Sequence, residues 1–251
     1  MKLTVVMVTR NAAAVVGEAL QSLAAQRGPA LELVVADGNS TDDTLAIVRR
    51  YAQLRPRILT GPDDGIYDAM NKAVAAAQGD ALYFLNADDR LAHPAALACL
   101  AEALTTSGAD LVFGDVLIQG AAGDHYRSHH RVTPRTLGFE PLSHQAVLAR
   151  RSVFARIGSF DTRWQVCADL DWLLRSGQAG LRWQHVGRLV CRCLAGGFSD
   201  QHVALKLSEV RQLRQRQRHP IDCLCQRWRA GVHRRLQPLG APQAPHPAKT
   251  T

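Results

Sequence analysis

Residues 81–89 read Ala-Leu-Tyr-Phe-Leu-Asn-Ala-Asp-Asp, so five apolar or aromatic residues run straight into an amide and, after one alanine, two adjacent carboxylates. Such an apolar run predicts a strand that is buried on both faces, as in a parallel sheet. Carboxylates at the end of a buried strand need a partner, which can be a divalent cation, a basic side chain or water. Two interpretations of Asp88 and Asp89 are open at this point: a site where Mg²⁺ or Mn²⁺ holds a diphosphate, and a solvated turn that caps the next helix.

The sequence before this stretch alternates between apolar runs and amphipathic segments. Strands are predicted at 3–8, 31–36 and 57–60, and helices at about 12–25, 44–54 and 66–78. This alternation predicts an α/β fold, with a Rossmann-like, mostly parallel sheet flanked by helices and joined by right-handed crossovers.

Each predicted strand ends in a polar loop. These loops lie at 9–11, 37–43, 61–65 and 86–89. Because the carboxyl ends of parallel strands meet at one edge of a sheet, we expect the loops to form a single ligand crevice.

The turn after the first strand, Thr-Arg-Asn-Ala-Ala-Ala, lacks the Gly-x-Gly-x-x-Gly fingerprint, and the sequence contains no Gly-Lys-Ser/Thr motif. A dinucleotide dehydrogenase and a P-loop enzyme are therefore disfavoured.

The chain after residue 89 follows a less regular pattern. Helices are predicted at 95–104, near 152–157 and from 166, and strands at 110–118 and 186–194. The polar residues 119–135 indicate an irregular segment or a hairpin at the sheet edge. The helix that begins at 166 carries Asp169 and Asp171 in its first turns.

The order and spacing of these motifs resemble the inverting family 2 glycosyltransferases of the GT-A fold, and above all bacterial members from polysaccharide and exopolysaccharide clusters. The resemblance covers roughly residues 1–200. Its pieces are Val-Thr-Arg-Asn at 8–11, Val-Ala-Asp-Gly-Asn-Ser-Thr-Asp-Asp-Thr at 35–44, Asp-Gly-Ile-Tyr-Asp-Ala-Met-Asn-Lys-Ala at 64–73, Ala-Gln-Gly-Asp at 77–80, Phe-Leu-Asn-Ala-Asp-Asp at 84–89, Ser-His-Gln at 143–145 and Ala-Asp-Leu-Asp at 168–171. It implies transfer of a sugar, with inversion, from a nucleoside diphosphate sugar to a glycan or lipid-linked acceptor.

The resemblance also implies roles for residues in the predicted crevice. Asp37 would bind the base or ribose of the donor, as a carboxylate can accept from base N–H groups or ribose hydroxyls. The remaining predicted substrate-binding residues are Thr9, Asn11, Asp64, Asn71, Lys72, Asn86, Asp88 and His144. Asp37 as a loop-ordering residue and Lys72 as a solvated lysine are the structural alternatives.

The same resemblance assigns Asp88 and Asp89 to a Mg²⁺ or Mn²⁺ site. The family's fuller pattern has an acid where this chain has Asn86, so Asn86 is expected to position the donor. Asp169 matches the family's general base, which takes the acceptor's proton as its oxygen attacks the anomeric carbon. Asp171 is the alternative base, and either residue could be only a helix cap. His144 would line the acceptor site or approach the metal.

The net charge of +8 on 251 residues is confined to one end of the chain. From Gln201 onward ten Lys and Arg residues are opposed only by Glu209 and Asp222, so that segment alone carries +8. We therefore predict three parts. They are a GT-A catalytic domain at 1–200 (nucleotide-sugar half about 1–115, acceptor half about 116–200), a basic helical appendage at 201–237 and a disordered tail at 238–251.

A basic amphipathic helix suits the surface of an anionic membrane, where lipid-linked acceptors lie. A solvated helix packed on the catalytic domain is the alternative. Nucleic acid is not an expected partner, because no nucleic-acid fold signature or aromatic stacking set accompanies the arginines.

No run of eighteen apolar residues and no signal peptide is found, and the six cysteines lack zinc-site spacing. The expected location is cytoplasmic, peripheral at the inner face of the plasma membrane.

Two other functions remain open from the sequence. A sugar-phosphate nucleotidyltransferase shares a similar sheet, but its Gly-rich phosphate loop with Arg and Lys is missing near the first strand. A non-catalytic nucleotide- or membrane-binding scaffold is the other alternative. The acidic set of Asp88, Asp89 and Asp169 argues against it.

Overall fold

A sheet of nine strands organises the part of the chain that the computed structural model describes, residues 1–216. Its strands are β1 (Lys2–Thr9), β2 (Ala30–Asp37), β3 (Arg57–Thr60), β4 (Ala81–Phe84), β5 (Arg90–Leu91), β6 (Leu111–Gln119), β7 (His125–Arg127), β8 (Val147–Arg150) and β9 (Trp183–Leu194). They are ordered β3-β2-β1-β4-β8-β6-β9-β5, and β7 pairs with β6.

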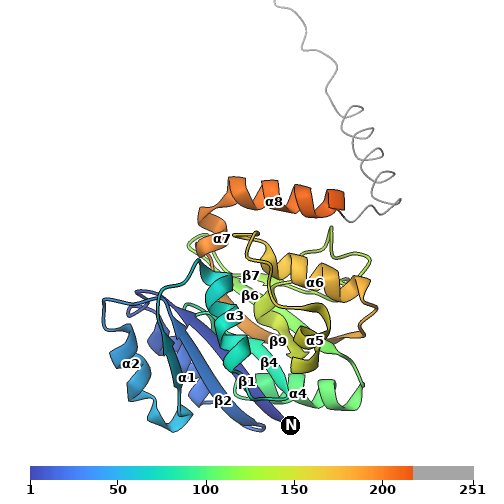
Figure 1. Cartoon of the computed structure of the whole chain (residues 1–251). Helices are drawn as coiled ribbons and strands as arrows, with labels where there is room; N and C mark the ends of the chain where they lie inside the picture. Colours follow the sequence, from blue (N-terminus) through green and yellow to red (C-terminus); the bar gives the residue numbers. More distant parts are fainter. Residues whose placement is uncertain (217–251) are drawn as a thin grey trace, which may run out of the picture. The chain divides into compact units, whose positions relative to one another are not determined.

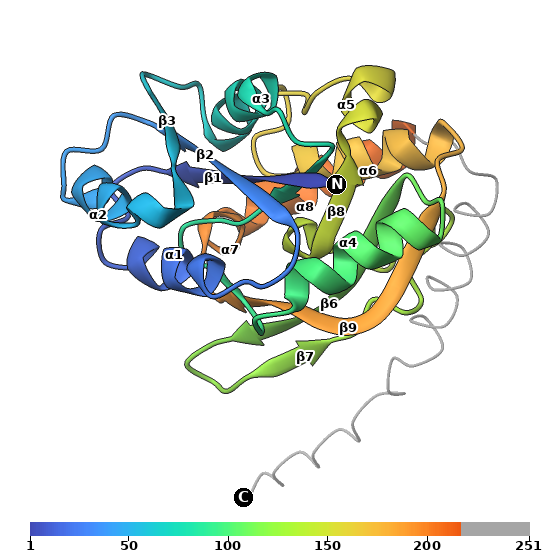
Figure 2. The ribbon, with the colours of Figure 1, turned by 90° about the horizontal axis from the view of Figure 1, so that it is seen from below.

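Helices cover both faces of the sheet. They are α1 (Val16–Ala24), α2 (Thr44–Arg50), α3 (Ile66–Ala76), α4 (Ala96–Thr106), α5 (Arg151–Ile157), α6 (Ala168–Gln178), α7 (Phe198–Gln201) and α8 (Val203–Arg216), with 3₁₀ turns at Ala52–Leu54 and His144–Ala146. Helices α1 and α4 lie on one face, and α3, α5 and α6 lie on the other (Figures 1 and 2).

The first half of the sheet is parallel, as the sequence predicts. Strand β1 pairs in parallel with β2 and β4, and β2 with β3. In this register Thr9, Asp37 and Thr60 are neighbours at the carboxyl ends of β1, β2 and β3. Strands β1 and β4 are almost entirely buried, since each has helices on both faces. The polar loops therefore emerge side by side at one edge of the sheet.

The second half of the sheet is mixed. Strand β8 is antiparallel to both β4 and β6, and β9 is parallel to β6. The sequence reading does not predict β8, because its four residues are too few to show a periodicity of their own. Of the two alternatives predicted for 119–135, an irregular segment or a hairpin, the structure has the hairpin, since β7 pairs antiparallel with β6.

An aromatic cluster fixes α6 against the sheet. Phe84 at the end of β4 contacts Phe154 of α5 and Phe160, with ring centroids 6.0 and 5.3 Å away. The Trp172 ring on α6 stacks on Phe154 with centroids 4.5 Å apart. The indole N–H of Trp172 donates to the Gly158 carbonyl at 3.1 Å. Rigid aromatic packing of this kind holds the amino end of α6 beside the end of β4.

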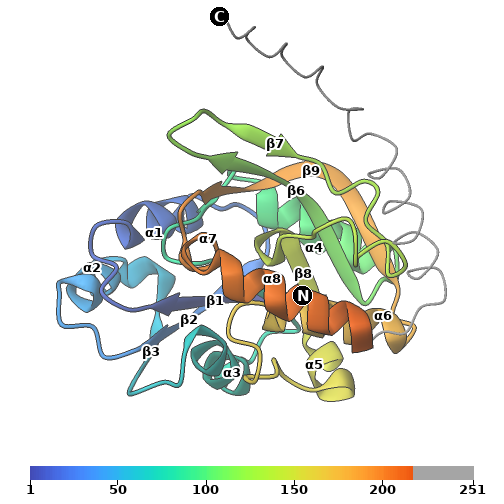
Figure 3. The ribbon, with the colours of Figure 1, turned by 90° about the horizontal axis from the view of Figure 1, so that it is seen from above.

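The described chain divides after Val210, and Met1–Val210 form one compact unit. The first residues of the predicted appendage, including the beginning of α8, thus belong to this unit. Figure 3 shows α7 and the start of α8 at the edge of the sheet where the parallel strands end. Residues 217–237 of the predicted basic segment and the predicted disordered tail at 238–251 lie outside the described residues. Among the described helices, none is both long and apolar enough to cross a bilayer.

Candidate active site

The first two loops of the crevice are joined through Asp37. This carboxylate is 3% exposed and lies at the end of β2. Its Oδ2 accepts from the hydroxyls of Thr9 at 2.8 Å and Ser40 at 2.6 Å, and its Oδ1 accepts from the Ser40 amide at 2.8 Å. Asp37 therefore orders the loop that follows it, the alternative role considered from the sequence. Its predicted contact with a nucleotide stays a prediction.

Asn11 completes the joint between these loops. The Asn11 side-chain oxygen accepts from the Thr41 backbone amide at 2.8 Å. The Asn11 backbone amide donates to Ser40 Oγ, also at 2.8 Å. Both Asn11 and Asn39 adopt left-handed backbone conformations, with φ of 49° and 57°. Asparagine adopts this conformation more readily than most other residues, so the two residues suit the tight turns of these loops.

The third loop is held by a lysine. Lys72 on α3 forms an ion pair with Asp68 at 2.6 Å and donates to the Pro62 carbonyl at 2.7 Å. Asp68 also accepts from the Asp64 amide at 3.0 Å, whereas the Asp64 side chain is exposed. These bonds fix the loop, and the predicted donor contacts of Asp64 and Lys72 stay predictions.

Asn71 has a different environment from the other predicted donor-binding residues. Its side-chain amide donates to the Phe160 carbonyl at 2.9 Å and accepts from the Phe160 amide at 3.0 Å. Both ends of the side chain thus join α3 to the segment before α6, and the predicted donor contact of Asn71 stays a prediction.

The two adjacent carboxylates after β4 have different environments. Asp89 is 2% exposed, and its oxygens accept from Gln145 Nε2 at 3.0 Å and the Leu194 amide at 3.2 Å. Burial and the nearby charge of Asp88 raise the pKa of Asp89 to about 6. Asp88 is only partly buried, and burial raises its pKa as well. Its Oδ2 lies beside Gly197, where an added Cβ would be 3.4 Å away.

Asn86 connects this loop to His144. Its Nδ2 lies 3.5 Å from His144 Nε2, and its Oδ1 is buried without a hydrogen-bond partner among the described residues. A buried oxygen without a donor is costly, so this oxygen is available to a water, a cation or a substrate group.

Asp169 lies at the amino end of α6 and is the centre of a hydrogen-bond network. Its Oδ2 is 2.8 Å from His144 Nδ1, and its Oδ1 accepts from the Leu170 amide at 2.8 Å. The Tyr67 hydroxyl lies 3.0 Å from that Oδ1 and 2.8 Å from the Val166 carbonyl oxygen. The Asp169 side chain remains 21% exposed, so a substrate hydroxyl can approach it.

This network sets the ionisation of the pair. Burial raises the pKa of Asp169, but the hydrogen bond and charge of His144 outweigh it and hold the net pKa below its usual value. Burial lowers the pKa of His144, but Asp169, Asp89 and Asp88 attract its proton and raise the net value. The Asp169 carboxylate is therefore ionised at neutral pH.

The rival residue Asp171 is occupied elsewhere. Its Oδ2 accepts from Arg175 Nε at 2.7 Å within α6, and the same guanidinium donates to the Ser159 carbonyl at 2.7 Å. Two residues along a helix point to different faces. Asp169 thus faces His144 and the crevice, whereas Asp171 holds the turn before the helix.

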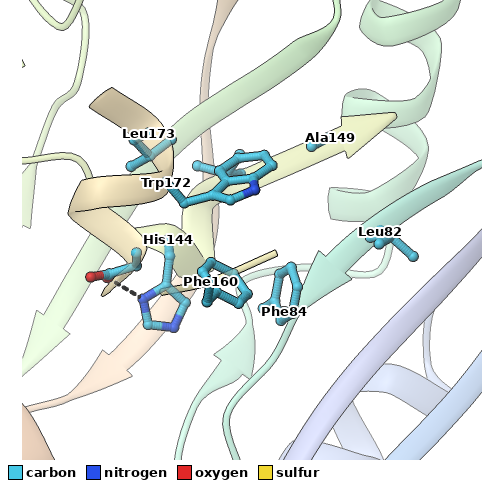
Figure 4. Close-up of a pocket in the computed structure, with 9 residues that line it drawn as sticks. Leu82, Phe84, His144, Ala149, Phe160, Trp172 and Leu173 are labelled. Carbon is cyan, nitrogen blue, oxygen red and sulfur yellow. Dashed lines mark hydrogen bonds and ion pairs between the residues drawn. The ribbon is translucent and has the colours of Figure 1, made fainter. Parts of the chain in front are cut away.

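Asp169 and His144 help to line an apolar cavity, which Figure 4 shows from close by. Its other lining residues are Leu82, Phe84, Val147, Ala149, Phe160, Trp172 and Leu173. In Figure 4 the His144 ring lies beside Phe160 and its Nδ1 points to the Asp169 carboxylate. Apolar neighbours lower the local dielectric, so the hydrogen bond between the pair is stronger there than in water.

The oxygen set fits a hard divalent cation in part. Asp88 offers a desolvated carboxylate, and Asn86 offers the orphaned oxygen. No group of three or more His, Cys, Asp or Glu side chains that could hold a metal occurs within residues 1–216. This set matches Mg²⁺ and Mn²⁺ sites that take one or two protein oxygens and complete their coordination with substrate phosphates.

Sequence reasoning did not identify Tyr67, Gln145 or Glu209, although each contacts or supports the site. Tyr67 and Gln145 lie within the motifs at 64–73 and 143–145, so their place in these motifs could have marked them as candidates. Glu209 stands out only as one of two acids in the basic segment.

Comparisons with known proteins agree on one family. Residues 4–165 match the sequence model of glycosyl transferase family 2. A PGL/p-HBAD biosynthesis glycosyltransferase of Mycobacterium tuberculosis (strain H37Ra) is 37% identical over 182 residues, which cover 68% of each chain. An uncharacterised glycosyltransferase of M. tuberculosis is 32% identical over 149 residues, 58% of this chain and 57% of the relative.

Solved structures share the fold. S. aureus TarS (residues 1–349) in complex with UDP-GlcNAc has a TM-score of 0.66 and 23% identity, over 77% of this chain and 58% of that one. The mannosyltransferase PcManGT from Pyrobaculum calidifontis, in complex with GDP-Man and Mn²⁺, has a TM-score of 0.62 and 21% identity, over 80% of this chain and 59% of that one. The chain therefore spans less than two thirds of either solved chain.

Proposed function

Since the chain belongs to glycosyl transferase family 2 and is a glycosyltransferase of the GT-A fold, we propose a finer description of its reaction. A sugar passes from a nucleoside diphosphate sugar to a glycan or lipid-linked acceptor, with inversion and with metal assistance, and Asp169 is the general base. Family membership sets aside the nucleotidyltransferase and scaffold alternatives.

One chain of contacts carries this proposal. It runs from Asn86, in the loop of the two carboxylates, through His144 to Asp169, with separations of 3.5 and 2.8 Å. The expected diphosphate end of the crevice and the expected base are thus adjacent. An inverting transfer needs this arrangement, because the hydroxyl attacks the anomeric carbon as the diphosphate leaves on the other side.

Asp169 suits the role of base because it is ionised, partly accessible and held in place. When the acceptor oxygen bonds to the anomeric carbon, its proton passes to the Asp169 carboxylate. His144 orients this carboxylate through Oδ2, and Tyr67 with the Leu170 amide orients it through Oδ1.

The residues that would hold Mg²⁺ or Mn²⁺ are Asp88 and the Asn86 oxygen. The metal would stabilise the negative charge on the leaving diphosphate. Asp89, predicted as a second ligand, has both oxygens hydrogen-bonded to the protein. In this conformation it orients the loop of Asp88, and direct ligation by Asp89 remains a prediction without a test.

The donor and the metal can be tested together. We expect one class among UDP-, GDP- and dTDP-sugars to raise the melting temperature in the presence of Mn²⁺. A ligand at a hundred times its dissociation constant stabilises the fold by about 2.7 kcal/mol. EDTA should abolish transfer of that sugar to an acceptor extract, and Asp88→Asn should abolish the Mn²⁺-dependent part of the stabilisation. Full activity in excess EDTA would contradict the metal proposal.

The proposed lipid-linked acceptor is supported by exposed apolar side chains in and before α8. Four exposed large apolar residues, Leu194, Phe198, Val203 and Leu207, lie within one short segment. Val203 and Leu207 are four residues apart on α8, so they share a helix face. Together with the +8 of the segment from Gln201 onward, this surface suits peripheral binding to an anionic membrane, with the enzyme on the cytoplasmic side.

A further inference from the structure

We propose that Glu209, on the C-terminal helix α8, is a positioning residue for Asp169: its carboxylate binds the backbone turn from which the catalytic helix α6 starts. The proposal rests on the assignment of Asp169 as the base. It adds a residue from a segment that lies beyond residues 4–165, the part that matches the family.

The Glu209 carboxylate is 4% exposed and accepts three successive backbone N–H groups. Its Oε1 accepts from the Gln165 amide at 2.8 Å, and its Oε2 accepts from the amides of Val166 at 3.0 Å and Cys167 at 2.9 Å. Successive backbone amides that converge on one anion form a nest, and bonds to a charged acceptor are stronger than neutral ones. Removal of this carboxylate would leave three amides without their acceptor.

The turn bound by Glu209 leads directly to Asp169. Cys167 is the residue before α6, and its own side chain makes no capping hydrogen bond. The Val166 carbonyl oxygen and Asp169 Oδ1 both lie within hydrogen-bond distance of the Tyr67 hydroxyl, at 2.8 and 3.0 Å. Glu209 thus holds one side of the turn and Tyr67 the other, and together they fix where α6 begins.

The segment that carries Glu209 also reaches the opposite end of the site. It starts after β9 at Ala195, passes Gly197 beside Asp88 Oδ2, and continues through α7 into α8. Residues 195–210, which we call the strap, therefore connect the carboxylate loop after β4 to the start of α6. Figure 1 shows α7 and the start of α8 at the edge of the sheet where the parallel strands end.

A first test measures the position of Asp169 without any substrate. Asp169, Asp88 and Asp89 are the carboxylates that attract the His144 proton. In the full-length protein, without donor or metal, the His144 ring is titrated by NMR and assigned with His144→Gln. If Glu209→Gln displaces Asp169, the His144 midpoint falls towards the value in Asp169→Asn, because the Asp169 carboxylate attracts the His144 proton. Glu102→Gln, the same change at an exposed site on α4, should leave the midpoint unchanged.

A second test uses kinetics with the donor found in the nucleotide-sugar panel. A displaced base lowers kcat, and we expect a decrease of about 10- to 100-fold with the KM for the donor unchanged. Glu209→Asp, which keeps the charge on a shorter side chain, should recover part of the loss, and Glu102→Gln should behave as the wild type. A folded Glu209→Gln protein with wild-type kcat and His144 titration overturns the proposal.

If Glu209→Gln does not fold, Glu209→Asp decides by the same two readouts. An unshifted His144 midpoint together with unchanged kcat then overturns the proposal, and a shift with a decreased kcat supports it. The NMR titration needs no sugar donor. It therefore tests the role of Glu209 even if the nucleotide-sugar panel gives no activity, an outcome that would count against the proposed reaction alone.

Discussion

The two acids of α6 differ in what their side chains touch, and that difference separates their roles. Asp169 contacts His144 and Tyr67, whereas Asp171 pairs with Arg175. We expect Asp169→Asn to lower kcat by about 10²- to 10⁴-fold, the usual contribution of a general base, and to leave the thermal stabilisation by donor and Mn²⁺ intact. Asp171→Asn should instead lower the melting temperature and keep kcat near wild type. The reverse pattern would reassign the base to Asp171.

Asp89 gives a prediction on pH and stability. Its pKa rises from 3.8 to about 6 in the fold, so the folded state binds this proton more tightly than the unfolded chain. The stability from this group is complete below about pH 4 and is lost as the pH rises through 6. The asparagine of Asp89→Asn does not titrate. The difference in free energy of unfolding between Asp89→Asn and the wild type should therefore shift in favour of the variant by about 2 to 3 kcal/mol from pH 4 to pH 7. Urea unfolding in EDTA measures this, and a constant difference across that range would contradict it.

At the residue scale the sequence predicted which side chains gather at the crevice better than it predicted their partners. Thr9, Asn11 and Asp37 do lie together, because strand pairing brings the ends of β1 and β2 side by side. The Tyr67 contact with Asp169 and the Glu209 contact with Val166 span long stretches of chain. No local pattern encodes such contacts, since they depend on how elements pack.

At the element scale the parallel half was predictable and the mixed half was not. The alternation before residue 90 encodes β1 to β4, since each crossover helix has its own periodicity. Strand β8 forms only because its short apolar run fits between β4 and β6. Its insertion also places His144, three residues before Val147, opposite Asn86. The position of His144 in the candidate site thus depends on a strand that the sequence pattern does not predict.

The junction of α3 and β4 gives an element-scale prediction. At Gly79 an added Cβ would lie 2.6 Å from the Thr4 backbone nitrogen and 2.9 Å from the Leu3 carbonyl carbon, so β1 would have to move. We expect Gly79→Ala to lower the free energy of unfolding by about 1 to 3 kcal/mol. Gly138→Ala, where no atom lies within 4 Å of the added carbon, is the control and should stay within about 0.5 kcal/mol of wild type. Equal free energies of unfolding for the two variants in urea would show that β1 moves away from the added carbon at no cost in stability.

At the scale of the whole molecule the charge is divided unequally between two parts of the chain. The net charge of residues 1–200 is zero, and the segment from Gln201 onward carries +8. That segment begins within the compact unit, where Glu209 contacts the turn before α6. The segment proposed to bind a membrane is therefore continuous with the part of the chain that holds the turn before Asp169. Contact with a membrane would act on the same strap that borders the site.

Membrane binding by this segment is the prediction for the complete chain. Each Lys or Arg near an anionic surface contributes about 1 kcal/mol. Replacement of Arg227, Arg229, Arg234 and Arg235 by Gln should thus weaken binding to vesicles with 30% anionic lipid by about two to three orders of magnitude. Co-sedimentation at low and high salt measures this, because added salt screens the attraction. Leu207→Ser, which removes an exposed apolar side chain, should weaken binding in a manner insensitive to salt. Equal binding of the wild type to neutral and anionic vesicles would refute an electrostatic contribution, whereas equal binding of the wild type and Leu207→Ser would exclude the apolar surface of α8.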